Sequence, residues 1–216
     1  MLDDLVLFID GEAIVIDKPS GLAVDRPRDR SPSVADRLDE LRFGFARAPQ
    51  PVHRLDRDTS GCLLLARNPK AHARFGQAFE AGGVSKRYLA VLDGVPDGTE
   101  GSIDLPLAKI SSAEAGWRMV GDAKGKAART RWTLLRTVDN RSLVAFFPET
   151  GRTHQIRVHA AEALGCPVAG DPVYGRAGPA MLLHAAALVV PRGTKPAIDV
   201  TAPLPARFAA AGFGEG

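Results

Sequence analysis

Two short apolar runs joined by an Asp-Gly turn stand near the start of the chain and restrict its fold more than any other feature. The run LVLFI ends at Asp10 and Gly11, and EAIVID follows directly. An Asp-Gly pair between two such runs is a strong hairpin signal, because both residues accept the backbone twist that a two-residue turn requires. The chain therefore begins with two adjacent antiparallel strands.

Further segments have the composition of buried strands and are bounded by turn residues. The strands predicted in this way are residues 61–67, 84–94, 128–138 and 142–148, of which the last two form a hairpin. Residues 180–190 are apolar throughout, so periodicity alone leaves strand and helix open. Hairpins mixed with helices predict an α+β fold, with a mixed, mostly antiparallel sheet in two halves flanked by helices.

One helix has clear signals at both of its ends. Asn68 offers an N-cap, Pro69 suits the first helical position, and Gly82 stands where helices commonly end. Phe75 and Phe79 lie one turn apart on a single face. We predict a helix from about residue 69 to residue 81.

Two more helices are predicted from apolar spacing. Val34, Leu38 and Leu41 follow a serine and indicate a short amphipathic helix over residues 33–41. The second helix starts from Thr153 as N-cap and ends at Gly165. Its apolar stripe consists of Ile156, Ala160, Ala163 and Leu164. In contrast, residues 111–128 are basic, contain glycine and have no clear period, which predicts irregular structure.

Composition limits the class of protein. A chain of 216 residues with 45% hydrophobic content can bury a full core, as one domain or as two lobes around a cleft. Cys62 and Cys166 lack metal-binding or redox spacing and predict reduced packing residues of a cytoplasmic protein. The N-terminal apolar run is too short for a signal peptide or a membrane span, so a soluble protein is expected.

Positive charge is concentrated in two segments. The chain has 28 Lys and Arg against 25 Asp and Glu, a mild excess that permits a nucleic-acid partner without requiring one. Between Arg118 and Arg136, six cations face only one acidic residue, and RPRDR (26–30) forms a second basic patch. Such patches are either solvated surface or phosphate-binding surface.

The stretch PVHRLDRDTSG (51–61) places unusual charge just before a buried strand. Asp56 lies between Arg54 and Arg57, where a partly desolvated carboxylate needs a cation. Asp56 is therefore either a functional carboxylate or a turn residue that binds backbone amides, and from the residues alone both interpretations stay open. For Asp58 we favour turn chemistry.

Arg157 and Tyr88 are the other candidates for chemistry. A cation in the first turn of a helix opposes the helix dipole, so Arg157 is expected to have an anionic partner such as Asp56 or a phosphate. The alternative is an exposed arginine that covers the apolar stripe. Strand alternation puts Tyr88, Ala90 and Leu92 on one face, which makes Tyr88 either a core residue or a platform for a base.

These motifs together resemble a known family. IVIDKPSGLAV, VHRLDRDTSGCLLLA, KRYLAVLDG, TGRTHQIRVHAAEALGCPVAGDPVYG and LLHAAAL occur in the order typical of the RluA-type pseudouridine synthases. The resemblance runs from about residue 5 to residue 205. It implies that a uridine in RNA is isomerised: the base is detached at N1, rotated, and rejoined through C5. It also implies a pseudouridine-synthase-like catalytic domain with a central RNA cleft.

The resemblance also implies roles for particular residues. Asp56 corresponds to the catalytic aspartate, Arg157 to its salt-bridge partner, and Tyr88 to the ring that packs on the target base. Arg54 resembles the arginine that holds the RNA opened by base flipping. We predict further RNA contacts at Lys86, Arg152 and His154.

Several expectations complete this hypothesis. Residues 1–216 form a single catalytic domain without the accessory RNA-binding domain found in many relatives, and the protein is a cytoplasmic monomer without metal or cofactor. The RNA is ribosomal or transfer RNA, and the sequence does not decide between them. One alternative is a catalytically idle RNA-binding module on the same fold. Another is a metal-dependent phosphodiesterase, disfavoured by its ligand spacing, that uses His53, Asp56, Asp58 and His154.

Overall fold

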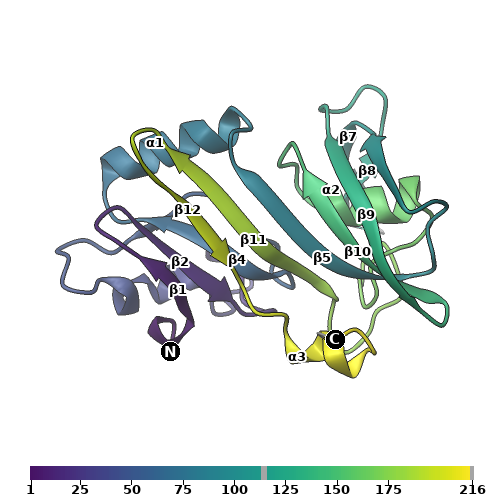
Figure 1. The fold of residues 1–216 in the computed structure, drawn as a ribbon, viewed down its shortest axis with the longest axis horizontal. Helices are drawn as coiled ribbons and strands as arrows, with labels where there is room; N and C mark the ends of the chain where they lie inside the picture. Colours follow the sequence, from purple (N-terminus) through teal and green to yellow (C-terminus); the bar gives the residue numbers. More distant parts are fainter. Residues whose placement is uncertain (113–115, 215–216) are drawn as a thin grey trace. The chain divides into compact units, whose positions relative to one another are not determined.

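The structure is a computed structural model that describes residues 1–112 and 116–214. The chain divides into two compact units (Figure 1). Unit 1 comprises Met1–Lys86 and Ala185–Pro203, and unit 2 comprises Arg87–His184 and Leu204–Gly216. Two strands, β5 (Ser85–Asp93) and β11 (Leu183–Arg192), contribute residues to both units.

A strand layer forms the core of unit 1. Its elements are β1 (Val6–Ile9), β2 (Ala13–Lys18), β4 (Ser60–Ala66), β11 and β12 (Lys195–Thr201), with the short β3 (Gln50–Pro51) beside β4. The predicted first hairpin is confirmed, since β1 and β2 are antiparallel. Asp10 closes its turn, because Oδ1 accepts hydrogen bonds from the amides of Glu12 and Ala13. The apolar segment near residue 185 is a strand.

The predicted helix after Asn68 is confirmed as α1 (Pro69–Glu80). The Asn68 side chain accepts a hydrogen bond from the Ala71 amide at 2.9 Å, which caps the first turn. Phe75 is fully buried in a core cluster with residues of β2, β4, β11 and β12. Helix α1 therefore packs its apolar face on the strands of unit 1 (Figure 1).

The prediction of one short amphipathic helix over residues 33–41 is correct in part. The segment forms two 3-10 helices, η2 (Val34–Asp36) and η3 (Leu38–Leu41), and another, η1 (Asp3–Leu5), precedes β1. Ser33 and Asp36 form a reciprocal capping box, and Arg37 has φ −121° and ψ 10°, which interrupts the helix. The predicted apolar face nevertheless is buried.

Unit 2 is built on a second set of antiparallel strands. The order is β5, β10 (Arg141–Pro148), β9 (Arg129–Val138) and β6 (Glu100–Asp104). The predicted strand at 84–94 and the predicted β9–β10 hairpin are confirmed. Ala90, Trp132 and Phe146 lie in the core cluster of this unit, and α3 (Ala206–Ala210) buries Phe208 in a neighbouring cluster.

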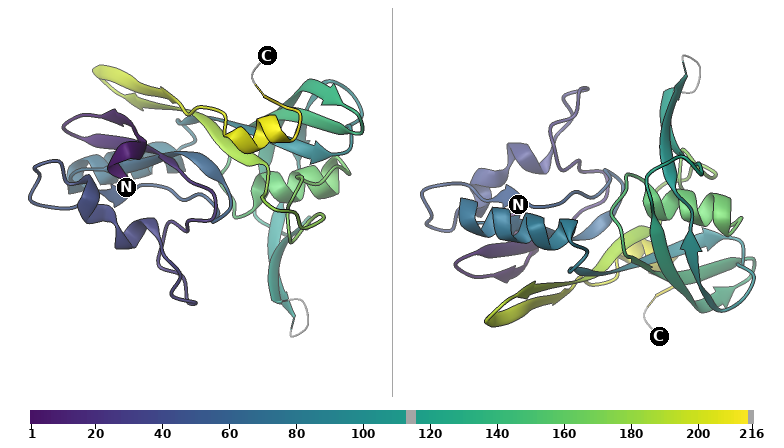
Figure 2. Two further views of the ribbon diagram at one scale, coloured as in Figure 1. Left: turned by 90° about the horizontal axis from the view of Figure 1, so that it is seen from below. Right: turned by 90° about the horizontal axis from the view of Figure 1, so that it is seen from above.

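The prediction of irregular structure over residues 111–128 is wrong for residues 111–112 and 116–121, which are strand, and agrees with the turn and loop at residues 122–128. Residues 113–115 lie outside the described part of the chain. Strands β7 (Leu107–Ser112) and β8 (Gly116–Gly121) form an antiparallel hairpin. Figure 2 shows this hairpin extending as an arm from the other strands of unit 2. Ser111 and Trp117, far from the base of the hairpin, are exposed, so apolar alternation is visible only at the base, where Leu107 and Met119 pack.

The helix predicted after Thr153 exists, but it starts differently. It consists of α2 (Gln155–Val158), continued by a π-helix, η4 (His159–Ala163). The N-cap position is held by His154 in the left-handed region (φ 54°) without a side-chain cap, so Thr153 is not the cap. The Gln155 side chain fixes the entry instead, since Oε1 accepts hydrogen bonds from the Thr150 hydroxyl and the Arg152 amide.

The fold class agrees with the prediction. Both units combine antiparallel pairings with a few short helices, which is an α+β architecture. Among the described residues, no helix is both long and apolar enough to cross a membrane.

Candidate active site

Asp56 lies in a short turn just before β4. The turn is closed by a hydrogen bond from the Thr59 amide to the Asp56 carbonyl oxygen at 3.1 Å. Leu55 and Thr59 are 6% and 2% exposed, so the residues around the turn are anchored in the protein. Asp56 itself is only partly buried. A carboxylate in such a turn is held in place while solvent or a substrate can still reach it.

A fully buried lysine holds this turn against the end of β2. The Lys18 Nζ donates hydrogen bonds to the carbonyl oxygens of Pro19 at 2.8 Å, Leu22 at 2.7 Å and Arg57 at 3.0 Å. An ammonium group has three donors, and burial without partners would be costly. Lys18 therefore ties two loops together beside Asp56. Lys18 occurs in the motif IVIDKPSGLAV, and its contacts with a distant loop could not be predicted from that motif.

Two more hydrogen bonds join the same loops. The Ser20 hydroxyl donates to the Asp58 carbonyl oxygen at 2.7 Å, and the Gly21 amide donates to the Arg57 carbonyl oxygen at 2.9 Å. Gly21 has φ 84°, a conformation that glycine adopts at little cost. The KPSG segment thus serves as a brace for the Asp56 turn.

The two arginines beside Asp56 form ion pairs with two aspartates of the loop after Val24. The Arg54 Nη1 lies 2.9 Å from the Asp25 Oδ2, and the Arg57 Nη2 lies 2.9 Å from the Asp29 Oδ2. Hydrogen bonds from the Ser31 amide, Arg57 and the Ser31 hydroxyl lower the pKa of Asp29 to about 2. All four side chains are exposed, and such pairs exchange readily in water. A phosphate could therefore replace either carboxylate.

His53 has a structural role in unit 1. Its ring stacks on Phe79 with the centroids 4.5 Å apart, and its Nε2 accepts a hydrogen bond from the Leu64 amide at 3.0 Å. Burial, followed by the positive charge of Lys86, lowers the pKa of His53 to about 3. Burial also lowers the pKa of Lys86. His53 is thus a neutral packing residue.

Tyr88 lies on β5 at the position opposite Phe146 of β10. It is partly buried and packs against the core cluster that contains Ala90 and Leu92. The predicted alternation is confirmed, because these three residues share one face of the strand. Tyr88 is thus held by strand pairing and by packing against the core of unit 2.

Arg157 has a buried carboxylate partner in unit 2. Its Nε lies 2.7 Å from the Asp171 Oδ2, and its Nη2 lies 2.8 Å from the Asp171 Oδ1. The two side chains are 6% and 0% exposed. Burial disfavours the charge on Asp171, but the hydrogen bonds and charge of Arg157, aided by two backbone amides, hold its pKa below the usual range. Arg157 is therefore ionised and rigidly oriented.

Asp171 is a partner of Arg157 that the sequence did not indicate. The residue occurs in the GDPVYG segment, which also forms a turn. The turn is real, since the Asp171 Oδ1 also accepts the amides of Val173 and Tyr174. The expected pairing of Arg157 with Asp56 joins residues of different units and stays a prediction.

Tyr174 connects the surroundings of Arg157 to the β7–β8 hairpin. Its hydroxyl lies 2.9 Å from the His154 Nδ1 and accepts the Met119 amide at 3.0 Å. The Arg157 guanidinium carbon lies 5.1 Å from the centroid of the Tyr174 ring. Arg152, in contrast, is exposed, and its Nε donates to the Ala127 carbonyl oxygen. The predicted RNA contacts Arg152 and His154 therefore occupy different surroundings.

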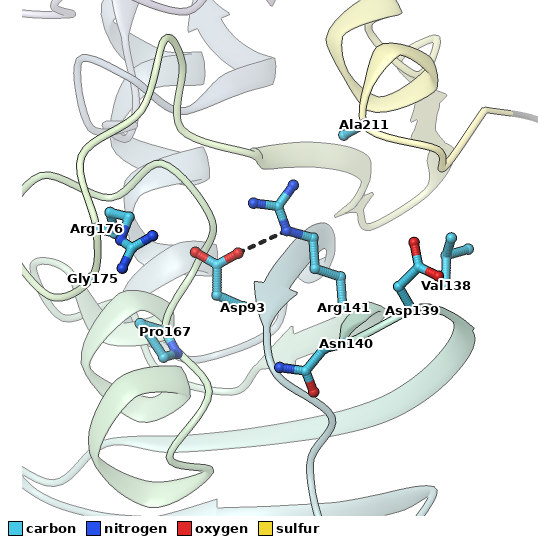
Figure 3. A pocket seen from close by; sticks show the side chains of 9 residues that line it. All are labelled: Asp93, Val138, Asp139, Asn140, Arg141, Pro167, Gly175, Arg176 and Ala211. Atoms are coloured by element: carbon cyan, nitrogen blue, oxygen red, sulfur yellow. Dashed lines mark hydrogen bonds and ion pairs between the residues drawn. The ribbon is translucent and has the colours of Figure 1, made fainter.

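A separate pocket of about 730 Å³ lies in unit 2. Asp93 and Arg141 form an ion pair of 2.8 Å within it, and Figure 3 shows this pair between Arg176 on one side and Asp139 on the other. It contains none of the predicted site residues. Within residues 1–112 and 116–214, no three His, Cys, Asp or Glu side chains gather in a way that could hold a metal ion.

Comparison with known proteins decides the family. The model of the family described as RNA pseudouridylate synthase matches residues 12–162, which include Asp56, Tyr88 and Arg157. The chain belongs to this family. It is therefore an RNA pseudouridine synthase, an isomerase.

Curated relatives support the family at high coverage. An uncharacterized RNA pseudouridine synthase of Zymomonas mobilis is 58% identical over 96% of this chain and 97% of its own length. The ribosomal large subunit pseudouridine synthase D of the same organism is 37% identical over 79% of this chain, but the match spans only 56% of that protein. Ribosomal large subunit pseudouridine synthase C of Rickettsia felis is also matched over 56% of its length.

Solved structures of the family have the same fold. Human RNA pseudouridylate synthase domain containing 4 has a TM-score of 0.81 and 25% identity, covering 96% of this chain and 91% of that one. Human RNA pseudouridylate synthase domain containing 1 has a TM-score of 0.76 and 30% identity, covering 92% and 82%. The predicted fold class is thus confirmed for this family.

Proposed function

We propose that this chain converts specific uridines of ribosomal RNA into pseudouridine, with Asp56 as the catalytic carboxylate. The observation that carries the proposal is the family match over residues 12–162, which contains the motif around Asp56. The brace formed by Lys18 supports it, because catalysis requires a carboxylate in a fixed position.

In this mechanism the bond between N1 of the base and C1′ of the ribose breaks, the base rotates, and C5 bonds to C1′. The proton on C5 leaves and N1 gains a proton, so the reaction has no net oxidation or hydrolysis. An ionised Asp56 either stabilises the positive charge that develops on the sugar or captures it as a nucleophile. Tyr88 packs on the flipped base and assists removal of the C5 proton.

Arg157 is proposed to keep Asp56 ionised and oriented. A guanidinium carries five N–H donors, so Arg157 can serve a second carboxylate in addition to Asp171. The fixed geometry of the Arg157–Asp171 pair supports this role, since a prepositioned cation loses little entropy when it meets Asp56.

RNA is proposed to contact both units as parts of one catalytic domain. Arg54 exchanges its exposed Asp25 partner for a phosphate, while Lys86, Arg152 and His154 provide further contacts. Ribosomal RNA is favoured over transfer RNA because relatives are named ribosomal large subunit pseudouridine synthases. We place this activity, by a monomer, in the cytoplasm, consistent with the two free thiols.

Asp56→Asn tests the catalytic assignment, with Asp58→Asn as a matched control in the same turn. We expect Asp56→Asn to fold, to bind RNA and to form no pseudouridine, while Asp58→Asn stays close to the wild type. Normal turnover by Asp56→Asn would reject the assignment. If the protein is instead a catalytically idle RNA-binding module, the wild type will form no pseudouridine either. Site-resolved pseudouridine mapping in a deletion strain identifies the RNA, and loss of a transfer RNA site would reject the ribosomal substrate.

A further inference from the structure

The β7–β8 hairpin has two chemically different faces. Its register places Ser111 opposite Trp117 and Lys109 opposite Met119, so these residues share one face. Met119 and the base of this face pack near Val158 of α2. Ile110 pairs with Arg118 on the opposite face, and Ile110 is 42% exposed. The first face is thus attached to α2 at its base and is open farther along the arm.

Trp117 is exposed on the first face but is held in place. It is 49% exposed, and its ring stacks on His154 with the centroids 5.2 Å apart and the planes at 25°. The other tryptophan of the chain, Trp132, is 5% exposed and belongs to the core. An aromatic ring this exposed loses hydrophobic stabilisation, so its fixed orientation calls for a functional explanation.

The ring beneath Trp117 is itself fixed by two further contacts. The His154 Nδ1 lies 2.9 Å from the Tyr174 hydroxyl, and the two rings meet edge to face at 5.6 Å. His154 also has φ 54°, a left-handed conformation that is unfavourable for a residue with a side chain. The backbone strain and the three ring contacts together place the imidazole under the indole. The stack is therefore a built feature of unit 2.

One cation lies close to the exposed indole. The Lys109 Nζ lies 5.1 Å from the centroid of the Trp117 ring, on the same face of the hairpin. Other exposed cations lie elsewhere on the hairpin: Arg118 is on the opposite face, and Lys124 and Lys126 follow β8. An aromatic face beside a cation can bind an unpaired base together with its phosphate, because stacking is sequence-tolerant and the cation binds the backbone. An apolar protein partner would not need this cation.

We propose that Trp117, supported by His154 and Tyr174, is a stacking platform for an unpaired base of the RNA substrate. This inference rests on the proposed function and adds a binding site that is separate from the target uridine. Lys109 then neutralises a phosphate next to the stacked base. The platform selects RNA with an unpaired segment over fully paired RNA, since only an unpaired base can present its face to the indole.

Tryptophan fluorescence tests the platform directly. The signal of Trp117 is the difference between the wild type and Trp117→Phe, because Trp132 is common to both proteins. We expect a stem-loop RNA to quench this signal, and a duplex of the same base composition to quench it much less. A Trp117 signal that stays unchanged at saturating stem-loop RNA would overturn the proposal.

Kinetics provide a second test with a matched control. We expect Trp117→Ala to raise KM for the stem-loop about 5- to 150-fold, from a stacking energy of about 1–3 kcal/mol per base, with little change in kcat. Trp117→Phe and Tyr174→Phe should have smaller effects of the same kind. Ile110→Ala, an equally exposed apolar residue on the other face, should leave KM unchanged. Circular dichroism confirms that each variant folds.

The outcomes separate this inference from the proposed function. If the wild type forms pseudouridine and Trp117→Ala has the wild-type KM, the platform is rejected and the enzyme assignment stands. The same holds if Ile110→Ala raises KM as much as Trp117→Ala does. If the wild type forms no pseudouridine but the Trp117 signal is still quenched by the stem-loop, the proposed function is rejected and the platform stands.

Discussion

The ammonium nitrogen of Lys18 lies 3.0 Å from the carbonyl oxygen of Arg57, the residue that follows Asp56 in the chain. Lys18 is fully buried and also donates to the carbonyl oxygens of Pro19 and Leu22. A buried cation is costly unless its donors are satisfied, and here backbone oxygens of two loops satisfy them. Through these three hydrogen bonds, Lys18 contributes more to the position of the Asp56 turn than Ser20 does through its single hydrogen bond.

Replacing Lys18 with methionine should therefore affect both stability and catalysis. Lys18→Met leaves three carbonyl oxygens without this donor, and we expect the free energy of unfolding to fall by about 3 kcal/mol. We also expect kcat to fall about 100-fold, because small displacements of a catalytic group are costly. Urea unfolding and single-turnover assays measure the two effects.

Ser20→Ala is the control for Lys18→Met, since it removes a single hydrogen bond to the same turn. We expect a loss of about 1 kcal/mol in stability and a small change in kcat. If Lys18→Met retains the wild-type kcat, the turn does not depend on Lys18 for its geometry.

The buried Arg157–Asp171 pair predicts a strong effect of Asp171→Asn. Removal of the carboxylate leaves the charge of Arg157 buried, and we expect a loss of about 3–5 kcal/mol in the free energy of unfolding at pH 7. Asp104→Asn breaks the Arg129–Asp104 pair, which has the same 2.7 Å separation but is exposed, and it should change stability little. Equal effects of the two variants would contradict the assigned importance of the buried pair.

Asp171 also predicts an acid dependence of stability. Its pKa in the folded state is below the ordinary value near 3.9, so its contribution is complete above that value and is lost as the pH falls through the folded pKa. Urea unfolding between pH 5 and pH 3 should therefore show a smaller acid loss for Asp171→Asn than for the wild type. Parallel acid losses would argue against an ionised Asp171 as a source of stability.

The low pKa of His53 predicts that stability also depends on pH at higher pH values than those at which Asp171 acts. The folded state holds its pKa at about 3, whereas the unfolded chain takes up a proton near pH 6.5. Stability should thus be greatest above pH 6.5 and fall below it, by at most about 1.4 kcal/mol per pH unit, until the folded pKa is reached. His53→Gln should reduce this slope. Part of the slope should remain in this variant, because burial also lowers the pKa of His159. An unchanged slope would exclude His53 as a source of the pH dependence.

Tyr88 allows its ring and its hydroxyl to be tested separately. Tyr88→Phe keeps the ring that packs on the core next to β10, so we expect KM to stay close to the wild-type value. If the phenol takes part in proton removal, kcat should fall about 100-fold or more. Tyr88→Leu, which removes the ring, should also raise KM. Pseudouridine formation by Tyr88→Phe at the wild-type kcat would limit Tyr88 to packing.

Local signals predicted the fold where neighbouring residues decide the structure. The Asp10 turn, the Asn68 cap and the β9–β10 hairpin each depend on residues close in sequence, and all were predicted correctly. Other features depend on distant contacts. The β7–β8 hairpin packs at its base near Val158, and the entry to α2 is fixed by Gln155, whose Nε2 donates to the Arg129 carbonyl oxygen.

The candidate site shows the same division between residues that local motifs indicate and residues whose roles depend on distant contacts. Asp56, Tyr88 and Arg157 stand in motifs that the sequence displays, so they could be predicted from the residues and the family resemblance. Lys18 and Asp171 could not be assigned roles, because their contacts reach other parts of the chain. Both stand in segments with Pro and Gly, which are typical of turns and do not by themselves reveal a distant partner.

The two free cysteines make it possible to time local opening of each unit. Cys62 lies on β4, just after the Asp56 turn, and Cys166 follows the helix that carries Arg157. Both thiols are buried, and burial raises the pKa of each, to about 12 for Cys62. Because only an accessible thiolate reacts quickly, an alkylating reagent modifies each cysteine only while its surroundings are open, and it reports the opening rate when alkylation is faster than reclosing. Labelling rates measured with and without RNA therefore show which of the two units the substrate holds closed.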